Sequence, residues 1–435
     1  MDSVGYMVQD LLEGIRESVR YILSLGPRQF VRAFWALLFL EVPRYLFSDL
    51  YVLVKAMLGR TRAPLAPHLD PPPLVSVILP VLDERDIVGE TVRSLREQGY
   101  PNLEIIVIDD GSLDGTQEIC EGLGRRGWIR FLGFPDRQGK SAALNWGLQH
   151  SRGEYVVFMD SDSTLDRGAL RNLLAYFADP EVGAVSGDLS VRNPRINLLT
   201  RLQTMEYLTA LTIGRTFRAG IGILSIVPGA FGAFRRELID RVGGHEPGPG
   251  NDSDLTIRTR KLGYKVAFAP DATCLTNSPE SWKGWLKQRL RWDRNLIRNR
   301  LRKHVDVYAF WQRHFSLTNL VSFVDTMFFA VVLSIGWLIY AADLAVRQPP
   351  HWIAIAFASY LLHLLLKSAQ YAIALAVTPR RKELVGLAVY LPLFSLYRIA
   401  CRLVRLVAVI QEIVFRKSYR DPFAPEKVRK EMIVY

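Results

Sequence analysis

The hydrophobic pattern of the central part of the chain is that of an α/β domain. Short apolar runs over Val75–Pro80 and Glu104–Asp109 are rich in β-branched residues, and we predict that both form buried parallel strands. Each run is followed by a turn and an amphipathic stretch, which is βαβ organisation. A further run over residues 155–159 predicts a strand that ends at Asp160.

Longer apolar segments flank this domain. Residues 316–346 and 351–377 are each long enough to span a bilayer, and we predict one more membrane helix over residues 30–58. The alternation of apolar and charged residues over 4–27 indicates a helix at the membrane interface.

Residues 385–415 have a different pattern, because Arg398, Arg402 and Arg405 share one helical face. This basic stripe indicates an interfacial helix, or a helix whose basic side faces a polar lumen, rather than a lipid-exposed span.

The segments together predict four units. These are an N-terminal interfacial and membrane unit over 1–60, a cytosolic domain over 74–310, membrane and interfacial helices over 316–415, and a basic cytosolic tail over 416–435. A proline-rich linker over 63–73 precedes the central domain.

Composition agrees with a soluble domain joined to membrane helices. The chain has 435 residues, of which 49% are hydrophobic, and a net charge of +12. Lys and Arg gather on cytoplasmic flanks of membrane helices, as in the cluster Thr378–Lys382. No nucleic-acid recognition motif accompanies this charge, so we expect no nucleic-acid partner. Three widely separated cysteines predict neither a disulfide framework nor a zinc site.

Carboxylates follow three of the predicted strands. Glu84 follows the first strand, Asp109 and Asp110 the second, and Asp160 and Asp162 a later one. Ligands of open α/β sheets bind at the carboxyl ends of the strands. Each group alone could be a turn or a helix cap, but several like charges at one edge favour a hard cation, Mg²⁺ or Mn²⁺, that shares a substrate diphosphate.

Five motifs occur in a fixed order along this domain: Ile78–Glu84, Ile108–Ser112, Gly139–Asn145, Asp160–Asp162 and Gln288–Trp292. This set resembles the membrane-bound family 2 glycosyltransferases, which include cellulose, hyaluronan, chitin and poly-N-acetylglucosamine synthases. The resemblance implies a GT-A-type nucleotide-sugar-binding domain, with a mixed Rossmann-like sheet, inserted between α-helical transmembrane segments.

The resemblance also implies roles for the strand-end residues. Asp110, with Asp109 beside it, corresponds to the acid that contacts uridine. Glu84 and Lys140 lie in loops that surround the donor. Asp160 and Asp162 correspond to the Asp-x-Asp motif that contacts the nucleotide and the metal.

Gly250–Thr256 lies where the family has a pair of acids, of which the second is the general base. Aligning the shared Leu-Thr makes Asp252 the base, but Asn251 replaces the first acid. Asp254 therefore stays an alternative, as does a helix-capping cluster. A carboxylate is needed because the attacking hydroxyl must lose its proton.

A basic aromatic helix is predicted around Gln288, Arg291 and Trp292. The resemblance assigns Gln288 and Arg291 to the diphosphate and Trp292 to an acceptor platform. The alternative is an amphipathic interfacial helix that packs its aromatic residues. Gly229–Arg236 resembles the strand that lines the acceptor site, although its glycines suit a tight turn or close packing equally well.

The function that we predict is an inverting, processive polysaccharide synthase of the plasma membrane, multi-pass with its catalytic domain in the cytosol. It would take a UDP-sugar donor, elongate a polysaccharide acceptor and pass the β-glycan through the lipid bilayer, with accessory export proteins as further partners. The stretch Arg291–Arg298 is more similar to the hyaluronan and chitin-oligomer branch.

Two other functions compete with this prediction. One is transfer of a single sugar to a lipid carrier, by enzymes that generally lack the Gln-x-x-Arg-Trp motif. The other is a membrane-anchored binding or transport protein without catalysis, against which Asp252 argues.

Overall fold

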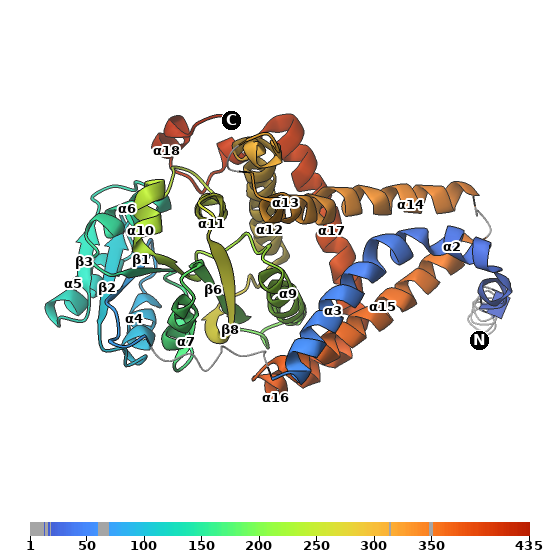
Figure 1. The fold of residues 1–435 in the computed structure, drawn as a ribbon, viewed down its shortest axis with the longest axis horizontal. Helices are drawn as coiled ribbons and strands as arrows, with labels where there is room; N and C mark the ends of the chain where they lie inside the picture. Colours follow the sequence, from blue (N-terminus) through green and yellow to red (C-terminus); the bar gives the residue numbers. More distant parts are fainter. Residues whose placement is uncertain (1–12, 14–15, 18, 60–68, 313–314, 348–350) are drawn as a thin grey trace, which may run out of the picture.

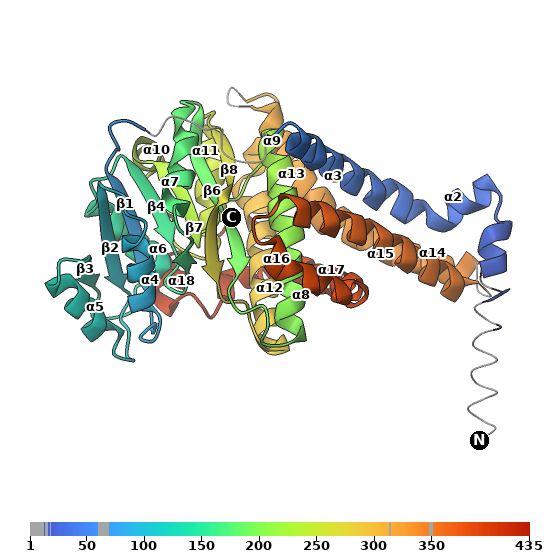
Figure 2. The ribbon, with the colours of Figure 1, turned by 90° about the horizontal axis from the view of Figure 1, so that it is seen from below.

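The computed structural model describes residues 13, 16–17, 19–59, 69–312, 315–347 and 351–435. An α/β domain occupies one side of the molecule, and long helices project from the other (Figures 1 and 2). Residues 4–12, 14–15 and 18 of the helix predicted over 4–27, and residues 63–68 of the predicted linker, lie outside the described residues. Residues 19–24 are helical.

The α/β domain is built on one mixed sheet with the strand order β3-β2-β1-β4-β7-β6-β8-β5. β1 lies between β2 and β4 and is parallel to both, whereas β7 is antiparallel to β4. The strands are β1 (Val75–Val81), β2 (Leu103–Asp109), β3 (Arg130–Gly133), β4 (Tyr155–Met159), β5 (Thr164–Leu165), β6 (Val182–Val191), β7 (Phe231–Arg235) and β8 (Lys265–Thr276). The predicted mixed sheet is confirmed.

β1, β2 and β4 are mainly apolar because both faces of the sheet are covered, whereas β6 and β8 also carry polar side chains. In β1, Val77 and Leu79 pack on one face, and Ile78 packs on the other. The first face is covered by α4 (Val88–Arg96), α5 (Thr116–Arg125) and α7 (Ala169–Ala175), which η2 (Tyr176–Ala178) extends. The second is covered by α6 (Lys140–Gln149), α10 (Arg236–Val242) and α11 (Asn251–Lys261).

The parallel order of β2, β1 and β4 determines where the carboxylates lie. Val81 at the end of β1 is level with Asp109 at the end of β2, and Ile78 is level with Phe158 of β4. The residues that follow these strands therefore meet at one edge of the sheet, as the sequence predicts.

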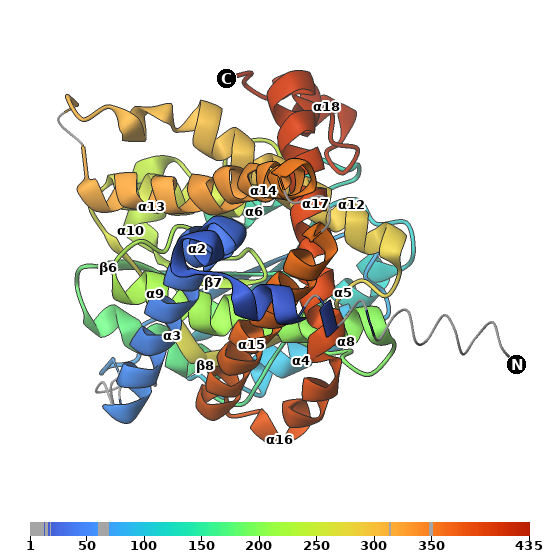
Figure 3. The same cartoon turned by 90° about the vertical axis from the view of Figure 1, so that its right-hand side faces the viewer.

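A layer of helices lies between the sheet and the projecting helices (Figures 1 and 2), and Figure 3 shows the projecting helices end on, in front of this layer. Ser281 caps the longest of these helices, α12, by accepting a hydrogen bond from the Gly284 N–H at 3.1 Å. The layer consists of α8 (Leu198–Glu206), η3 (Tyr207–Ile213), α9 (Gly214–Gly220), α12 (Trp282–Arg298), η4 (Asn299–Lys303) and η5 (Val305–Tyr308).

Three helical stretches among the described residues are long and apolar enough to cross a membrane. The first is α13 (Leu317–Met327) continued by η6 (Phe328–Val332) and α14 (Leu333–Arg347), and the second is α15 (Trp352–Val377). The third joins α16 (Arg381–Leu384) and η7 (Val385–Tyr390) to α17 (Leu391–Phe415), which packs against α12.

The N-terminal helices α2 (Pro27–Ala36), η1 (Leu37–Glu41) and α3 (Val42–Met57) pack along α15 (Figure 1). They do not belong to those three stretches, so their membrane crossing stays a prediction. After α17 the chain turns through η8 (Lys417–Arg420) and returns to the α/β domain as α18 (Glu426–Glu431).

Charged side chains pair with one another between the projecting helices. Glu41 of η1 forms ion pairs with Arg402 of α17 and His363 of α15, and accepts a hydrogen bond from the Trp337 indole. Further along α15, Lys367 donates to Gln370, whose amide donates to Asp49 of α3. A polar line, made of two separate hydrogen-bonded groups, therefore runs between helices that also carry exposed apolar side chains.

Candidate active site

Glu84, Asp160 and Asp162 lie together at the carboxyl edge of the sheet. Burial raises the pKa of Glu84 to about 7, and the neighbouring charges of Asp162 and Asp160 add to this effect. Burial and then Asp160 likewise raise the pKa of Asp162. The edge thus concentrates negative charge that the protein only partly compensates.

This donor set suits a hard divalent cation. Such ions take oxygen ligands and usually complete their shell with water and substrate phosphates. Among the described residues, no group of three or more acidic, His or Cys side chains could hold a metal ion by itself. Asp160 and Asp162 could supply two ligands, and a cation there would need further ligands from water or a substrate diphosphate.

The two acids after β2 have different surroundings. The buried Asp109 accepts hydrogen bonds from the backbone N–H and the hydroxyl of Ser112, and so closes the Asp-Gly-Ser turn. Asp110 instead accepts from the backbone N–H groups of Gln138 and Gly139, at 2.7 and 2.9 Å. Burial raises the pKa of Asp110.

Asp110 thereby holds the segment Asp136–Lys140, which we call the donor loop. Gly139 has a φ of +93°, which favours glycine and turns the loop into α6. Asp110 therefore faces the donor loop, whereas the hydrogen bonds of Asp109 stay within its own turn.

Lys140 at the end of the donor loop forms an ion pair with Asp160. Partial burial lowers the pKa of Lys140, but Asp160 and Asp252 outweigh it and leave the pKa raised. A β-carbon at Gly229 would lie 3.4 Å from the Lys140 ammonium and 3.9 Å from the Asp252 β-carbon. Gly229 thus lines the site, whereas Gly232 packs closely on Val227.

Asp252 and Asp254 begin α11 but point to different environments. The Asp252 carboxylate accepts one hydrogen bond from the Ser253 N–H at 2.7 Å and borders the same cavity as Lys140 and Gly229. Burial raises the pKa of Asp252, as a proton acceptor requires.

Asp254 is buried and fully engaged. Its carboxylate pairs with Arg258 at 2.8 Å, Lys303 at 2.6 Å and His304 at 2.9 Å. Burial alone would raise the pKa of Asp254, but these three partners outweigh it and hold the pKa well below its usual range. The surroundings of Asp252 therefore suit a proton acceptor better than those of Asp254, whose carboxylate is held by Arg258, Lys303 and His304.

α12 carries the three residues predicted near the diphosphate and the acceptor. Gln288 has a buried side-chain oxygen without a hydrogen-bond partner, and Arg291 lies close enough to Lys140 to lower its pKa. Trp292 is 41% exposed, so it is not a core residue of the helix.

The Trp292 ring is supported by Arg289, whose guanidinium carbon lies 5.0 Å from the ring centroid. Arg289 is itself held by Glu206 of α8 at 2.8 Å, and Glu206 also pairs with Arg398 of α17. The exposed indole therefore rests on a fixed support.

Sequence reasoning missed the role of the C-terminal residues Asp421–Tyr435, which we call the strap. Arg137 of the donor loop donates to the Phe423 carbonyl at 2.6 Å, and Lys427 donates to Gln138 at 2.9 Å. Pro425 and Val428 lie against Gly139. The strap thus covers the donor loop, and no motif in it indicates this.

His245 is a further part of the site that the sequence analysis does not predict. It lines the cavity beside Asp252, is 5% exposed, and neither ring nitrogen has a hydrogen-bond partner. Burial and the nearby cations lower its pKa to about 3, so the imidazole is neutral.

Comparison with known proteins identifies the family. The model described as "Glycosyl transferase family 2" matches residues 76–243. The probable glycosyltransferase YdaM of Bacillus subtilis (strain 168) is 31% identical over 292 residues, which cover 61% of this chain and 69% of the relative.

A poly-β-1,6-N-acetyl-D-glucosamine synthase of Staphylococcus epidermidis is 30% identical over 220 residues. These cover 50% of this chain and 53% of the synthase, so the match spans about half of the synthase.

Among solved structures, the mannosyltransferase PcManGT from Pyrobaculum calidifontis, in complex with GDP-Man and Mn²⁺, has a TM-score of 0.53. It is 24% identical, and the alignment covers 88% of this chain and 99% of that one, which establishes a common GT-A fold. Since the likeness to YdaM extends over more than two thirds of that protein and the family model matches the strand-edge motifs, the chain belongs to glycosyltransferase family 2 and is a glycosyltransferase.

Proposed function

We propose that the protein is an inverting, processive synthase that transfers N-acetylglucosamine from its UDP-sugar to a β-linked glycan. The observation that carries this proposal is that Lys140, Gly229 and Asp252 border one cavity, with Asp160 paired to Lys140 and Arg291 nearby. Side chains that could bind the donor, accept the proton and stabilise the leaving group therefore lie close together.

The reaction follows from these groups. Asp252 takes the proton of the acceptor hydroxyl as its oxygen forms a bond to the anomeric carbon. On the opposite face the bond from that carbon to the diphosphate breaks, and the electron pair leaves with UDP. Attack opposite the leaving group inverts the anomeric configuration.

Cationic and polar groups stabilise the departing diphosphate. Arg291 suits it through planar, charge-assisted hydrogen bonds, and the side-chain amide N–H group of Gln288 can donate a further hydrogen bond to it. Lys140, now paired with Asp160, would turn to the phosphates when the donor enters. A divalent cation held by Asp160 and Asp162 would neutralise further phosphate charge.

Processive elongation is supported by α12 and by the helices beside it. Trp292 presents an exposed, supported indole on which a sugar ring can stack. Arg402 and the buried residues Glu41 and Lys367 of the polar line would exchange their present protein partners for the hydroxyls of a glycan between the helices. We propose that the glycan leaves along this line, from a cytosolic catalytic domain through the plasma membrane.

The sugar is proposed from the relatives, because the matched staphylococcal protein is named a poly-β-1,6-N-acetyl-D-glucosamine synthase. The test is to supply the purified full-length protein with UDP-N-acetylglucosamine, UDP-glucose or UDP-glucuronic acid and analyse the products by mass spectrometry.

A ladder of N-acetylhexosamine oligomers is the expected result. A single sugar attached to lipid would overturn processivity but keep the transferase chemistry, and a ladder from another donor alone would overturn the sugar.

A further inference from the structure

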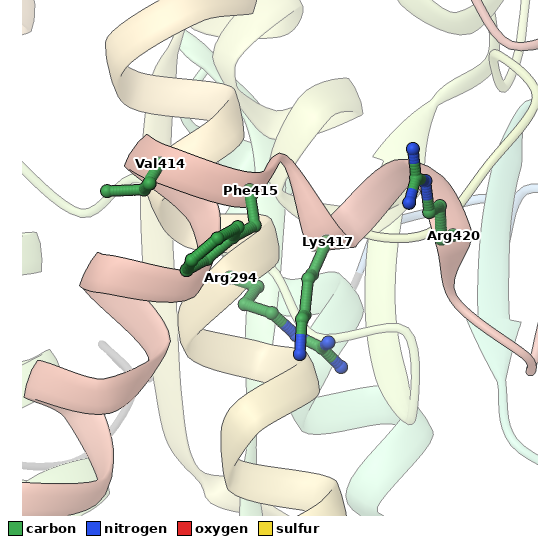
Figure 4. Close-up of a pocket in the computed structure, with 5 residues that line it drawn as sticks. All are labelled: Arg294, Val414, Phe415, Lys417 and Arg420. Atoms are coloured by element: carbon green, nitrogen blue, oxygen red, sulfur yellow. The ribbon is translucent and has the colours of Figure 1, made fainter.

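A cationic cleft lies where α17 ends, apart from the active site. Its volume is about 520 Å³, and it is lined by Arg294 of α12, Val414 and Phe415 of α17, and Lys417 and Arg420 of η8 (Figure 4). In Figure 4 the charged ends of Arg294 and Lys417 lie next to each other, with Phe415 on one side and Arg420 further along η8. The cleft thus combines several positively charged side chains with an apolar wall.

The chain holds this arrangement in place. Glu412, which is fully buried, accepts hydrogen bonds from the Ser418 N–H at 2.8 Å and the Ser418 hydroxyl at 2.9 Å. Arg302 of η4 pairs with the same carboxylate at 2.6 Å. The turn that carries Lys417 is therefore fixed before any ligand binds.

Among the residues that the structure describes, no acidic side chain forms an ion pair with the cations that line the cleft. Glu412 is neutralised by Arg302, and Asp421 is 1% exposed and accepts a hydrogen bond from the Phe423 N–H at 3.0 Å. Within the part of the chain that the structure describes, neither Lys417 nor Arg420 has an ion-pair or hydrogen-bond partner. The charged ends of Arg294 and Lys417, which lie next to each other, repel, and an anion between them would relieve that repulsion.

The surroundings indicate which anion. An apolar stripe runs along one face of α17 and ends at the cleft, with spacing of three or four residues. It consists of the exposed residues Leu396, Ile399, Leu403, Val407, Ile410 and Val414. A free phosphate would use the cations but not this stripe, whereas a phospholipid would use both through its head group and its acyl chain.

We propose that this cleft binds the phosphate of an anionic phospholipid, with an acyl chain along Phe415 and the α17 stripe. Anionic lipids are attracted to clusters of Lys and Arg beside membrane helices. The site adds a ligand that the transferase chemistry does not require, and it does not depend on which sugar is transferred.

Binding can be measured by thermal unfolding of the full-length protein in a neutral detergent. The probes are dioctanoyl phosphatidylglycerol, dioctanoyl phosphatidylcholine and glycerol phosphate. We expect phosphatidylglycerol to raise the unfolding temperature at concentrations about tenfold below those that phosphatidylcholine needs. Glycerol phosphate alone should have no comparable effect, and 0.5 M salt, on the order of the strength that screens exposed charges, should weaken the response.

Variants then locate the site. Arg294→Gln with Lys417→Gln should bind phosphatidylglycerol about tenfold more weakly, which corresponds to about 1.4 kcal/mol. Arg294→Lys with Lys417→Arg keeps the charge and should retain binding. The matched control is Arg125→Gln with Arg126→Gln, an equal loss of charge at the exposed end of α5, far from α17 (Figure 1).

Three results would overturn the proposal. Equal stabilisation by phosphatidylglycerol and phosphatidylcholine would mean that the cleft does not distinguish the charge of the head group. Equal loss in the α5 control would mean a general charge effect. A full response to glycerol phosphate would assign the cleft to a free phosphate compound.

Discussion

The guanidinium carbon of Arg291 lies 4.2 Å from the centroid of the Phe423 ring. The ammonium nitrogen of Lys287, one turn earlier on α12, lies 4.9 Å from the same centroid. A residue near the C-terminus thus contacts the arginine that we assign to the diphosphate, and its carbonyl also binds the donor loop through Arg137. The strap therefore connects the leaving-group arginine to the loop that covers Asp110.

Removing the Phe423 ring should loosen this connection. We expect Phe423→Ala to raise the KM for the donor several-fold, in line with the loss of a cation–π contact of about 1 kcal/mol, while kcat changes less. Phe423→Tyr should restore the KM. Ile433→Ala, at a 63% exposed position of the strap, is the control. An unchanged donor KM in the alanine variant would contradict a positioning role for Phe423.

Substitutions of Asp252 and Asp254 should have different effects on transfer and on stability. Asp252→Asn removes the proton acceptor, so transfer should fall about 10²–10⁴-fold while donor binding and unfolding temperature persist. Asp254→Asn leaves Arg258, Lys303 and His304 without their shared anion, and breaking such a buried pair costs about 3–5 kcal/mol. Turnover, donor binding and thermal unfolding, measured on both variants, distinguish the two. A stable Asp254→Asn protein that binds the donor without turnover would reverse the assignment.

The sequence predicts well which acids lie at the edge of the sheet, because their position depends only on the strands that directly precede them. The polar residues at or just after the carboxyl end of a buried parallel strand lie at a known edge of the sheet, as they do for β1, β2 and β4. The different roles of Asp109 and Asp110 depend on a turn and on a loop 28 residues away, which strand patterning does not contain.

The strap and the cationic cleft could not be predicted because their contacts are distant in sequence. Phe423 meets Arg137 across 286 residues, and the strap has no hydrophobic periodicity that assigns it to a surface. The sequence shows the basic stripe of α17, but the partners of this stripe, Glu41, Glu206 and Asp293, belong to three other helices. Only the fold brings these charges together.

Metal dependence is expected from the carboxylates after β4. Chelation should abolish transfer, and Mg²⁺ or Mn²⁺ should restore it. Asp162→Asn should weaken Mn²⁺ binding measured by calorimetry in the presence of UDP, because the site would lose one of its two protein ligands. Asp86→Asn, at an exposed position in the loop after β1, is the control. Full turnover in excess chelator would contradict the expectation.

Asp188 of β6 should make stability depend on pH. It is 8% exposed, one of its carboxylate oxygens has no hydrogen-bond partner, and burial, opposed by Arg215, raises its pKa to about 7. The native state therefore keeps this proton up to about pH 7, whereas the unfolded chain loses it near pH 4. Since the native state binds more protons in that window, stability should fall as the pH rises through it.

Asp188→Asn removes this contribution, because the amide has the same shape and does not titrate. Relative to the wild type, the variant should gain stability as the pH is raised from 5 to 8, by about 1.4 kcal/mol for each pH unit between the two pKa values. Thermal unfolding at several pH values measures the difference, with Asp86→Asn again as the exposed control. Parallel curves for the wild type and Asp188→Asn would mean that Asp188 is already ionised in the native state.

Product length should depend on Trp292. Its indole is 41% exposed and rests on Arg289, which Glu206 anchors to α8, so a sugar stacked on it would be held while the next donor binds. Losing a large aromatic contact costs about 2 kcal/mol or more at a binding hot spot, which lets a short product leave before the next addition. Trp292→Ala should therefore give short oligomers at unchanged donor hydrolysis, and Trp292→Phe should keep part of the length. Trp311→Ala, at a 74% exposed position outside the site, is the control. The measurement is product size by mass spectrometry at matched donor turnover, and polymer of unchanged length from Trp292→Ala would remove the indole from the acceptor path.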